Sequence, residues 1–396
     1  MKISAAAKKA IMIGVLCSCS YLAVYVARNI LGAVSPQIIE QGVFSTENIG
    51  TLSSVYFVTY ALGQLINGVI GDRINAKYMI SFGLVFAGIC NAVFSAVSSG
   101  GMIAYVVYGA TGLGLSMIYA PMTKVVAENT EPVYATRCSL GYTFASYFGS
   151  PLAGVLASFL FWKAVFGFSS IMLIVMGLVC FGFFTVFEKK GVVRYGQYGR
   201  GRITRESINT LIKHRIVKFT AISILTGVVR TSVVFWLPTY ISQHLGFSSD
   251  RSALLFTVAS LVISSSAFAA VFIYECLGRN LDLTMRIAFI GSAVSFLMVF
   301  FLQNPALNLI FMVLAILCSN CAASMLWSRY CPSLRDTGVT STATGFLDFV
   351  SYMAAAASSS IFANAVSGIG WSGLIIVWFA LMVVGVVITS FNKQAQ

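Results

Sequence analysis

Charged residues are scarce in this sequence: only 9% of its residues are Asp, Glu, Lys or Arg, whereas soluble globular domains usually carry about 25%. Hydrophobic residues make up 58%, which is more apolar surface than the core of a soluble domain can bury. These two values exclude a soluble fold. They predict that the lipid bilayer is the solvent for much of the chain.

The sequence also lacks the patterns that mark enzymes and cofactor-binding proteins. It has two histidines, no nucleotide-binding loop, no cluster of metal ligands and no nucleophile elbow with partner residues. Cys318 and Cys321 have C-x-x-C spacing, but no second pair accompanies them, so packing is the preferred interpretation. We therefore predict no enzymatic activity, no cofactor, no metal site and no ATP-driven pumping.

Apolar segments of about 20 residues, the length that crosses the hydrocarbon core as a helix, recur about twelve times. They lie near 10–39, 47–70, 78–98, 101–127, 137–160, 163–187, 217–243, 250–275, 284–303, 307–329, 338–366 and 371–391. This pattern predicts an all-α membrane protein with an N-terminal six-helix half over 1–187, a basic cytoplasmic linker over 188–216 and a C-terminal six-helix half over 217–396.

The positive charges predict the orientation in the membrane. The net charge of +13 suggests nucleic-acid binding until the charges are mapped onto the loops between apolar runs. With the N-terminus inside, only Lys163 and Arg251 lie on the outer side, and Arg28 and Arg230 lie within helices; every other Lys and Arg is cytoplasmic. This asymmetry is typical of inner-membrane proteins. We predict a plasma-membrane protein, such as one of the bacterial inner membrane, with both termini cytoplasmic and no nucleic-acid partner.

An internal repeat relates the two halves. Arg28 is followed eight residues later by Pro36, and Arg230 is followed eight residues later by Pro238. A second repeat relates Gly141-Tyr142 to Gly345-Phe346, because each of these pairs is followed a few residues later by a Ser-Tyr pair. Repeated halves of this kind are typical of secondary transporters, which bind substrate near the midplane where the halves meet. The repeat predicts two pseudo-symmetric halves.

Three charged residues fall deep within apolar runs: Arg28, Arg230 and Asp348. A charge at such a depth costs about 2.5 kcal/mol or more, so each should face a wet cavity or a partner. The two arginines occupy equivalent positions in the halves, which predicts a clamp for an anion, because the guanidinium fork fits phosphate or carboxylate oxygens. Asp348 has three interpretations: a charge balance for an arginine, a proton carrier, or a partner for a substrate amine.

Helical spacing adds polar side chains to the predicted site. Tyr21 and Tyr25 precede Arg28 by seven and three residues, and Tyr60 and Gln64 are four apart, so each pair shares a helix face. Their hydroxyl and amide groups suit an oxyanion, although core tyrosines are common in membrane helices.

Residues 68–77, GVIGDRINAK, resemble the G-x-x-x-D-R-x-G-R-[RK] loop of the major facilitator superfamily. Asn75 and Ala76 replace the Gly and Arg of that pattern. The resemblance implies a structural and gating role for Asp72, Arg73 and Lys77 at the cytoplasmic end of the second helix.

Residues 24–36, 59–78 and 344–356 together resemble the organophosphate:phosphate antiporters, which include glycerol-3-phosphate and hexose-phosphate transporters. The resemblance implies the major facilitator fold and alternating access around a phosphate-binding site. It places the arginine pair of the family on Arg28 and Arg230, and site tyrosines on Tyr21, Tyr25, Tyr60 and Tyr352. A family lysine is Gln64 here, and a family histidine falls near Ser146; both substitutions remove positive charge.

These observations predict a monomeric secondary active transporter of a small anionic metabolite, a phosphate ester being favoured. Antiport with phosphate and proton-coupled transport both remain open. The alternative is a membrane sensor that binds a sugar phosphate without sustained flux, since the family that the sequence resembles includes such receptors.

Overall fold

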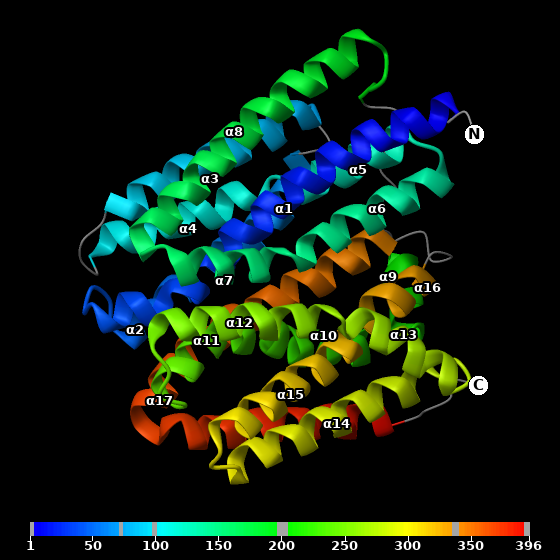
Figure 1. Ribbon diagram of the computed structural model, residues 1–396. Coiled ribbons are helices and arrows are strands. Elements are labelled where there is room, and N and C mark those ends of the chain that lie inside the picture. Colours follow the sequence, from blue (N-terminus) through cyan, green and yellow to red (C-terminus); the bar gives the residue numbers. More distant parts are fainter. Residues whose placement is uncertain (1–3, 71–73, 97–100, 196–204, 335–339, 392–396) are drawn as a thin grey trace. The chain divides into compact units, whose positions relative to one another are not determined.

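The computed structural model describes residues 4–70, 74–96, 101–195, 205–334 and 340–391, and this part of the chain is built of helices without a β-strand (Figure 1). Ten helical segments within it are long and apolar enough to cross a membrane. The last of these segments, Ala343–Ser390, contains two crossings. One further apolar segment is divided between two shorter helices, Pro132–Tyr147 and Gly149–Phe159. The prediction of an all-α membrane protein with about twelve crossings is confirmed.

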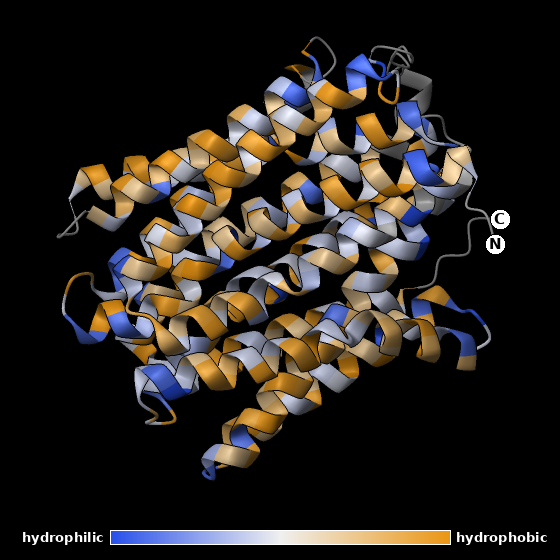
Figure 2. Ribbon diagram, turned by 45° about the horizontal axis from the view of Figure 1, so that its top comes forward, coloured by the Kyte–Doolittle hydropathy of each residue, from blue (hydrophilic) through white to orange (hydrophobic). Residues whose placement is uncertain are grey.

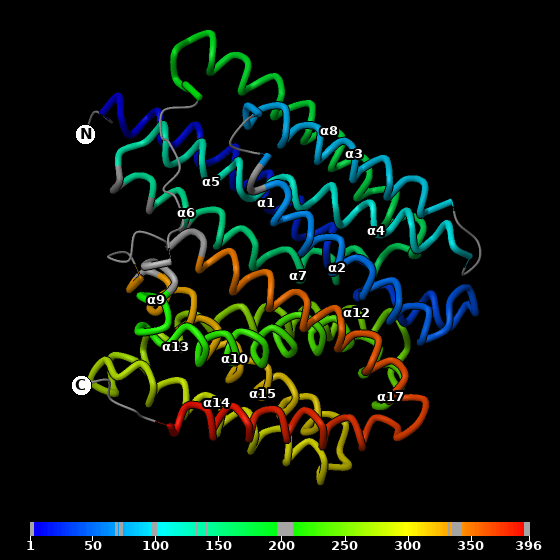
Figure 3. The backbone as a smooth tube through the Cα atoms, turned by 180° about the vertical axis from the view of Figure 1, so that it is seen from behind, coloured from blue at the N-terminus to red at the C-terminus, as the bar shows by residue number. Residues whose placement is uncertain are grey.

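The helices of the N-terminal half follow one another with short connections. They are α1 (Ala5–Glu40), α2 (Thr46–Ile70), α3 (Ala76–Ala96), α4 (Met102–Ser116), α5 (Tyr119–Asn129), α6 (Pro132–Tyr147), α7 (Gly149–Phe159) and α8 (Trp162–Lys189). Helices α4 and α5 together form one crossing, and α6 and α7 meet at Phe148. Figures 1 and 3 both show α3 lying along α8, and α1 packs against α6, α7 and α8.

The C-terminal half contains more interruptions. Its elements are α9 (Arg205–Lys213), α10 (Ile216–Gly227), η1 (Val228–Val233), α11 (Val234–Gln243), α12 (Ser249–Ser264), α13 (Ser266–Cys276), α14 (Leu281–Phe301), α15 (Pro305–Met325), η2 (Leu326–Tyr330), α16 (Cys331–Ser333) and α17 (Thr340–Ser390). Helix α9 lies within the segment 188–216, which the sequence predicts only as a polar linker. The elements η1 and η2 are π-helical turns within otherwise continuous crossings.

Helix α17 contains two membrane crossings joined at Gly370. The backbone of Gly370 has φ 70° and ψ 178°, a conformation with positive φ that glycine adopts without steric cost. The chain reverses there, and Figure 3 shows the two arms of α17 running in different directions. The sequence predicts the same break, between runs ending at 366 and starting at 371.

The chain forms two compact units, each of which includes a short segment from the opposite half. One unit comprises residues 1–48, 55–200 and 249–257, and the other comprises 49–54, 201–248 and 258–396. Residues 49–54 of α2 thus pack with the second unit, and residues 249–257 of α12 pack with the first. Small residues allow both contacts: a Cβ at Gly50 would collide with Ala363, and a Cβ at Gly154 would collide with Thr257.

The distribution of hydrophobic and hydrophilic residues over the helices is the one expected of a protein in a lipid bilayer. Figure 2 shows hydrophobic residues along the helices and hydrophilic residues gathered near helix ends and loops. Large apolar side chains such as Phe168, Phe272 and Ile310 are exposed on helix surfaces. Exposed apolar faces of this extent destabilise a protein in water and are stabilised by lipid. The chain is a multi-pass membrane protein.

The predicted orientation has a direct test by cysteine labelling. Gln303 follows the end of α14, Lys190 follows the end of α8, and both residues are exposed. The predicted orientation puts these two positions on opposite sides of the membrane. If both termini are cytoplasmic, a membrane-impermeant maleimide added to intact cells should label Gln303→Cys fully and Lys190→Cys hardly at all. The background should carry Cys19→Ser and Cys276→Ser, because these two native thiols are exposed. The opposite labelling pattern would refute the orientation.

Candidate functional site

Arg28 lies in the N-terminal half, inside a group of aromatic rings. It belongs to α1, and its residue surface is 8% exposed. The guanidinium carbon Cζ lies 5.2 Å from the ring centroid of Tyr25, 5.5 Å from that of Phe57 and 5.7 Å from that of Tyr60. Distances under about 6 Å allow cation–π attraction, so the rings stabilise a positive charge at membrane depth. The structure thus brings predicted Tyr25 and Tyr60 to Arg28, and adds Phe57.

A cluster of four tyrosines continues from Arg28 along α1. The ring centroid of Tyr21 lies 4.9 Å from that of Tyr25, 5.5 Å from that of Tyr119 and 5.9 Å from that of Tyr142. Tyr119 begins α5, just after the interruption that separates α5 from α4, and Tyr142 belongs to α6. Spacing within one helix predicts the first two tyrosines. It cannot predict the last two, because only helix packing brings them to α1.

Arg230 lies in the C-terminal half within the π-helical turn η1. Its Cζ atom lies 5.9 Å from the ring centroid of Trp327 and 5.7 Å from that of Tyr352. Its Nη2 atom lies 3.9 Å from an oxygen of Asp348, which is beyond hydrogen-bonding distance and makes the pair an electrostatic contact. Arg230 and Asp348 are both partly exposed, at 28% and 22% of their side-chain surfaces.

Two π-helical turns contribute to this second site. Arg230 is in η1, and Trp327 is in η2. A π turn inserts an extra residue into a helix and changes the direction of the side chains that follow, and such turns occur frequently at functional sites. Reasoning from the sequence missed Trp327. Neither turn has a proline or another signal that could have predicted it.

Close packing of α10 against α17 positions Asp348 and Tyr352. A Cβ at Gly227 would collide with the Ser351 hydroxyl and would lie 2.7 Å from the Ser351 carbonyl oxygen. The Ser223 hydroxyl donates a hydrogen bond of 2.8 Å to the Leu347 carbonyl. These contacts hold α17 against α10 one turn before Arg230. The carboxylate and the phenol, four residues apart on one helix face, therefore lie beside the arginine.

The other predicted residues lie apart from these ring contacts. Gln64 is half-buried one turn beyond Tyr60 on α2. Ser146 is buried, and its hydroxyl donates a 2.6 Å hydrogen bond to the Thr143 carbonyl of its own helix. Asp72 and Arg73 lie outside the described residues. The role of all these residues stays a prediction.

Lys77 forms an ion pair with Glu188, which joins the first turn of α3 to the last turn of α8. The Lys77 side chain is 10% exposed, so it is more enclosed than the sequence predicts for a cytosolic lysine. Nearby, burial raises the pKa of Tyr195, and the charge of Glu188 raises it further. The Tyr195 phenol therefore stays neutral, and Glu188 balances the charge of Lys77. The contact fits a structural role at the helix ends.

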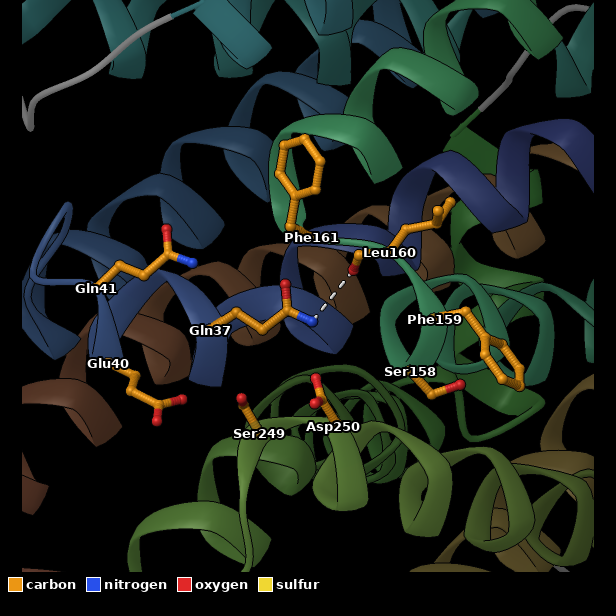
Figure 4. Close-up of a pocket in the computed structure, with 9 residues that line it drawn as sticks. All are labelled: Gln37, Glu40, Gln41, Ser158, Phe159, Leu160, Phe161, Ser249 and Asp250. Atoms are coloured by element: carbon orange, nitrogen blue, oxygen red, sulfur yellow. Dashed lines mark hydrogen bonds between the residues drawn. The ribbon is translucent and has the colours of Figure 1, made fainter.

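A cavity of about 440 Å³ lies elsewhere in the first unit, at the end of α1. The residues that line it include Gln37 and Glu40 of α1 and Ser249 and Asp250 at the start of α12 (Figure 4). The Gln37 amide donates hydrogen bonds to the carbonyl oxygens of two residues near the end of α7, Ala157 at 2.6 Å and Leu160 at 3.3 Å. None of the predicted site residues lines this cavity. Its two carboxylates make it unsuitable for an anion.

Each half therefore presents one intramembrane arginine beside aromatic rings, and in the C-terminal half a carboxylate accompanies it. Two six-helix halves with such groups at repeat-related positions define a membrane protein of the secondary-transporter class. Residues 17–359 match the Major Facilitator Superfamily, and the chain belongs to this family. The predicted family resemblance is confirmed, and the chain is not an enzyme.

Individual relatives differ in how much of the chain they match. The glycerol-3-phosphate transporter of Bacillus subtilis is 22% identical over 93% of this chain and 88% of its own length. The membrane sensor protein UhpC of Escherichia coli is 35% identical over 74 residues, but the match spans only 19% of this chain and 17% of the sensor.

Solved structures show the same fold at low sequence identity. A D-xylose–proton symporter has a TM-score of 0.78 and 13% identity, over 96% of this chain and 97% of its own. A bacterial homologue of the human lysosomal transporter Spinster has a TM-score of 0.76 and 11% identity, over 96% of both chains. At such identities the likeness establishes the fold alone.

Proposed function

We propose that this protein transports a small organic anion, preferably a phosphate ester, across the membrane by alternating access. In this proposal Arg28 and Arg230 are the anion-binding residues of their respective halves. The observation that carries the proposal is that both halves hold an arginine at the repeat-related position, each within 6 Å of aromatic rings from neighbouring helices. A charge kept at membrane depth in both halves has a cost that substrate binding explains.

Phosphate suits this arrangement better than other anions for two reasons. The guanidinium fork donates two parallel hydrogen bonds to phosphate oxygens and remains charged at every physiological pH. In addition, a relative that matches 93% of the chain is a glycerol-3-phosphate transporter. Tyr21, Tyr25, Tyr60, Gln64, Ser146 and Tyr352 are proposed as neutral donors around the anion, and Lys77 as part of the cytoplasmic gate.

Two coupling mechanisms would use Asp348 in different ways. The substrate anion competes with Asp348 for Arg230, since the carboxylate lies 3.9 Å from the guanidinium. Antiport with phosphate requires a second anion to replace the substrate on Arg230. Symport with a proton requires Asp348 to take up that proton when the anion arrives. Reconstituted protein distinguishes these mechanisms by which gradient drives uptake.

The test is flux in proteoliposomes that contain the purified full-length protein. We expect liposomes loaded with inorganic phosphate, or placed in an inward proton gradient, to take up radiolabelled phosphate or a phosphate ester. Uptake should exceed that of empty liposomes at least tenfold. Competition among phosphate esters, carboxylates and neutral sugars then defines the substrate class. Uptake of neutral sugars with no effect of phosphate esters would contradict the proposal.

A sensor function is the second candidate, because a 74-residue segment is 35% identical to a membrane sensor. A sensor binds its ligand without sustained flux. Saturable phosphate-ester binding to the purified protein, together with no uptake under either gradient, would favour this candidate over transport.

A further inference from the structure

The site around Arg230 holds a negative side chain as well as a positive one. In the C-terminal half, Arg230 is accompanied by Asp348, so these two charges cancel. In the N-terminal half, Arg28 is surrounded by the rings of Tyr25, Phe57 and Tyr60. A carboxylate beside the arginine weakens the attraction for any anion and is itself costly at membrane depth. Its presence is explained if part of the ligand is positively charged.

The site around Arg230 contains the two kinds of group that bind an ammonium, aromatic rings and a carboxylate. The rings of Trp327 and Tyr352 already lie within 6 Å of the cation Arg230. Aromatic faces of tryptophan and tyrosine attract ligand ammonium groups, and a carboxylate beside them supplies the opposite charge. These three side chains come from two elements, η2 and α17, and all of them lie close to Arg230.

On the basis of the proposed function, we infer that the substrate is zwitterionic: a phosphate ester that also carries a primary amine. Its phosphate binds Arg230, and its ammonium binds Asp348 between Trp327 and Tyr352. The contact between Arg230 and Asp348 is loose at 3.9 Å, so a ligand with both charges replaces it by two direct charge-assisted hydrogen bonds. Asp348 is then a specificity-determining residue that selects amine-bearing phosphate esters over their hydroxyl analogues.

Two pairs of matched ligands test this inference in proteoliposomes. Phosphoethanolamine is compared with 2-hydroxyethyl phosphate, and glucosamine 6-phosphate with glucose 6-phosphate, each as a competitor of radiolabelled inorganic phosphate. Within each pair the ligands differ mainly in the ammonium group. We expect the amine-bearing member to compete at least about tenfold better, the effect of one hydrogen bond between charged groups.

Substitutions show which side chains cause the preference for the amine-bearing ligand. Within each pair, the amine-bearing and hydroxyl-bearing ligands are compared by the ratio of their affinities as competitors. Asp348→Asn should reduce this ratio to about one, and Asp348→Glu should retain part of it. Trp327→Leu should reduce the ratio, whereas Trp327→Phe and Tyr352→Phe should keep most of it because they retain a ring face. Glu275→Gln is the matched control: it removes an exposed carboxylate at the end of α13 and should leave the ratio unchanged. Binding of inorganic phosphate verifies that each variant is folded.

The outcomes separate this inference from the proposed function. If inorganic phosphate competes but the two members of each pair are equal, the ligand needs no amine and the inference is wrong, while anion binding stands. The inference is also wrong if Asp348→Asn abolishes proton-driven uptake without changing the ratios, since Asp348 is then a proton carrier. If neither phosphate nor any ester binds the folded protein, the proposed function itself fails.

Discussion

Replacing Arg28 or Arg230 by lysine is expected to lower the initial rate of phosphate-ester uptake by about 10- to 100-fold. Lysine keeps the positive charge and its attraction to the neighbouring rings, but it cannot donate two parallel hydrogen bonds to one phosphate. The loss of one charge-assisted hydrogen bond is worth about 1.5–3 kcal/mol, which corresponds to this range. Both arginines should show the effect, because the proposal assigns anion binding to each of them.

Uptake in proteoliposomes and calorimetric titration of phosphate into the detergent-solubilised protein measure this effect. Arg251→Lys is the matched control, since Arg251 is exposed at the start of α12 and should tolerate lysine fully. Thermal unfolding of each variant shows whether the fold is intact. A stable Arg28→Lys or Arg230→Lys protein with unaltered uptake and phosphate affinity would remove that arginine from the site.

Replacing Gly50 by leucine is expected to separate the start of α2 from α17 and to abolish transport. A Cβ at Gly50 would collide with Ala363 and would lie 3.0 Å from the Ser359 carbonyl oxygen. The neighbouring serines hold the same contact: the Ser53 hydroxyl donates to Ser359 at 3.1 Å, and the Ser54 and Ser360 hydroxyls lie 2.8 Å apart. Small residues allow helix backbones to approach this closely in a membrane, and a leucine side chain has no space there.

Disulfide cross-linking measures the α2–α17 contact directly. In a background without native cysteines, the pair Ser54→Cys and Ser360→Cys should cross-link readily on mild oxidation. Adding Gly50→Leu should reduce the yield nearly to zero, and Gly50→Ala should have an intermediate effect. Gly167→Leu is the matched control, because no atom lies within 4 Å of a Cβ at this glycine of α8. Undiminished cross-linking in the Gly50→Leu protein would show that the contact does not depend on this glycine.

Some of the site was predictable because it depends on spacing within one helix. Tyr25 lies three residues before Arg28, and Asp348 lies four residues before Tyr352, so each pair shares a helix face. The equivalence of Arg28 and Arg230 was visible as a sequence repeat. The structure shows that this equivalence is not complete, since Arg28 lies in a regular α-helix and Arg230 lies in a π-helical turn. The proline eight residues later is retained in both halves and does not indicate this difference.

The amino-acid sequence alone is enough to identify a helical membrane protein, because hydropathy along the chain reports directly whether each segment is stable in lipid. It also determined which charges lie within the membrane segments, since that follows from position within an apolar run. Only the tertiary structure placed Trp327 beside Arg230, Tyr119 and Tyr142 beside Tyr21, and Gly50 against Ala363. These residues are distant in the sequence, and their contacts depend on how helices pack, which hydropathy and spacing do not specify.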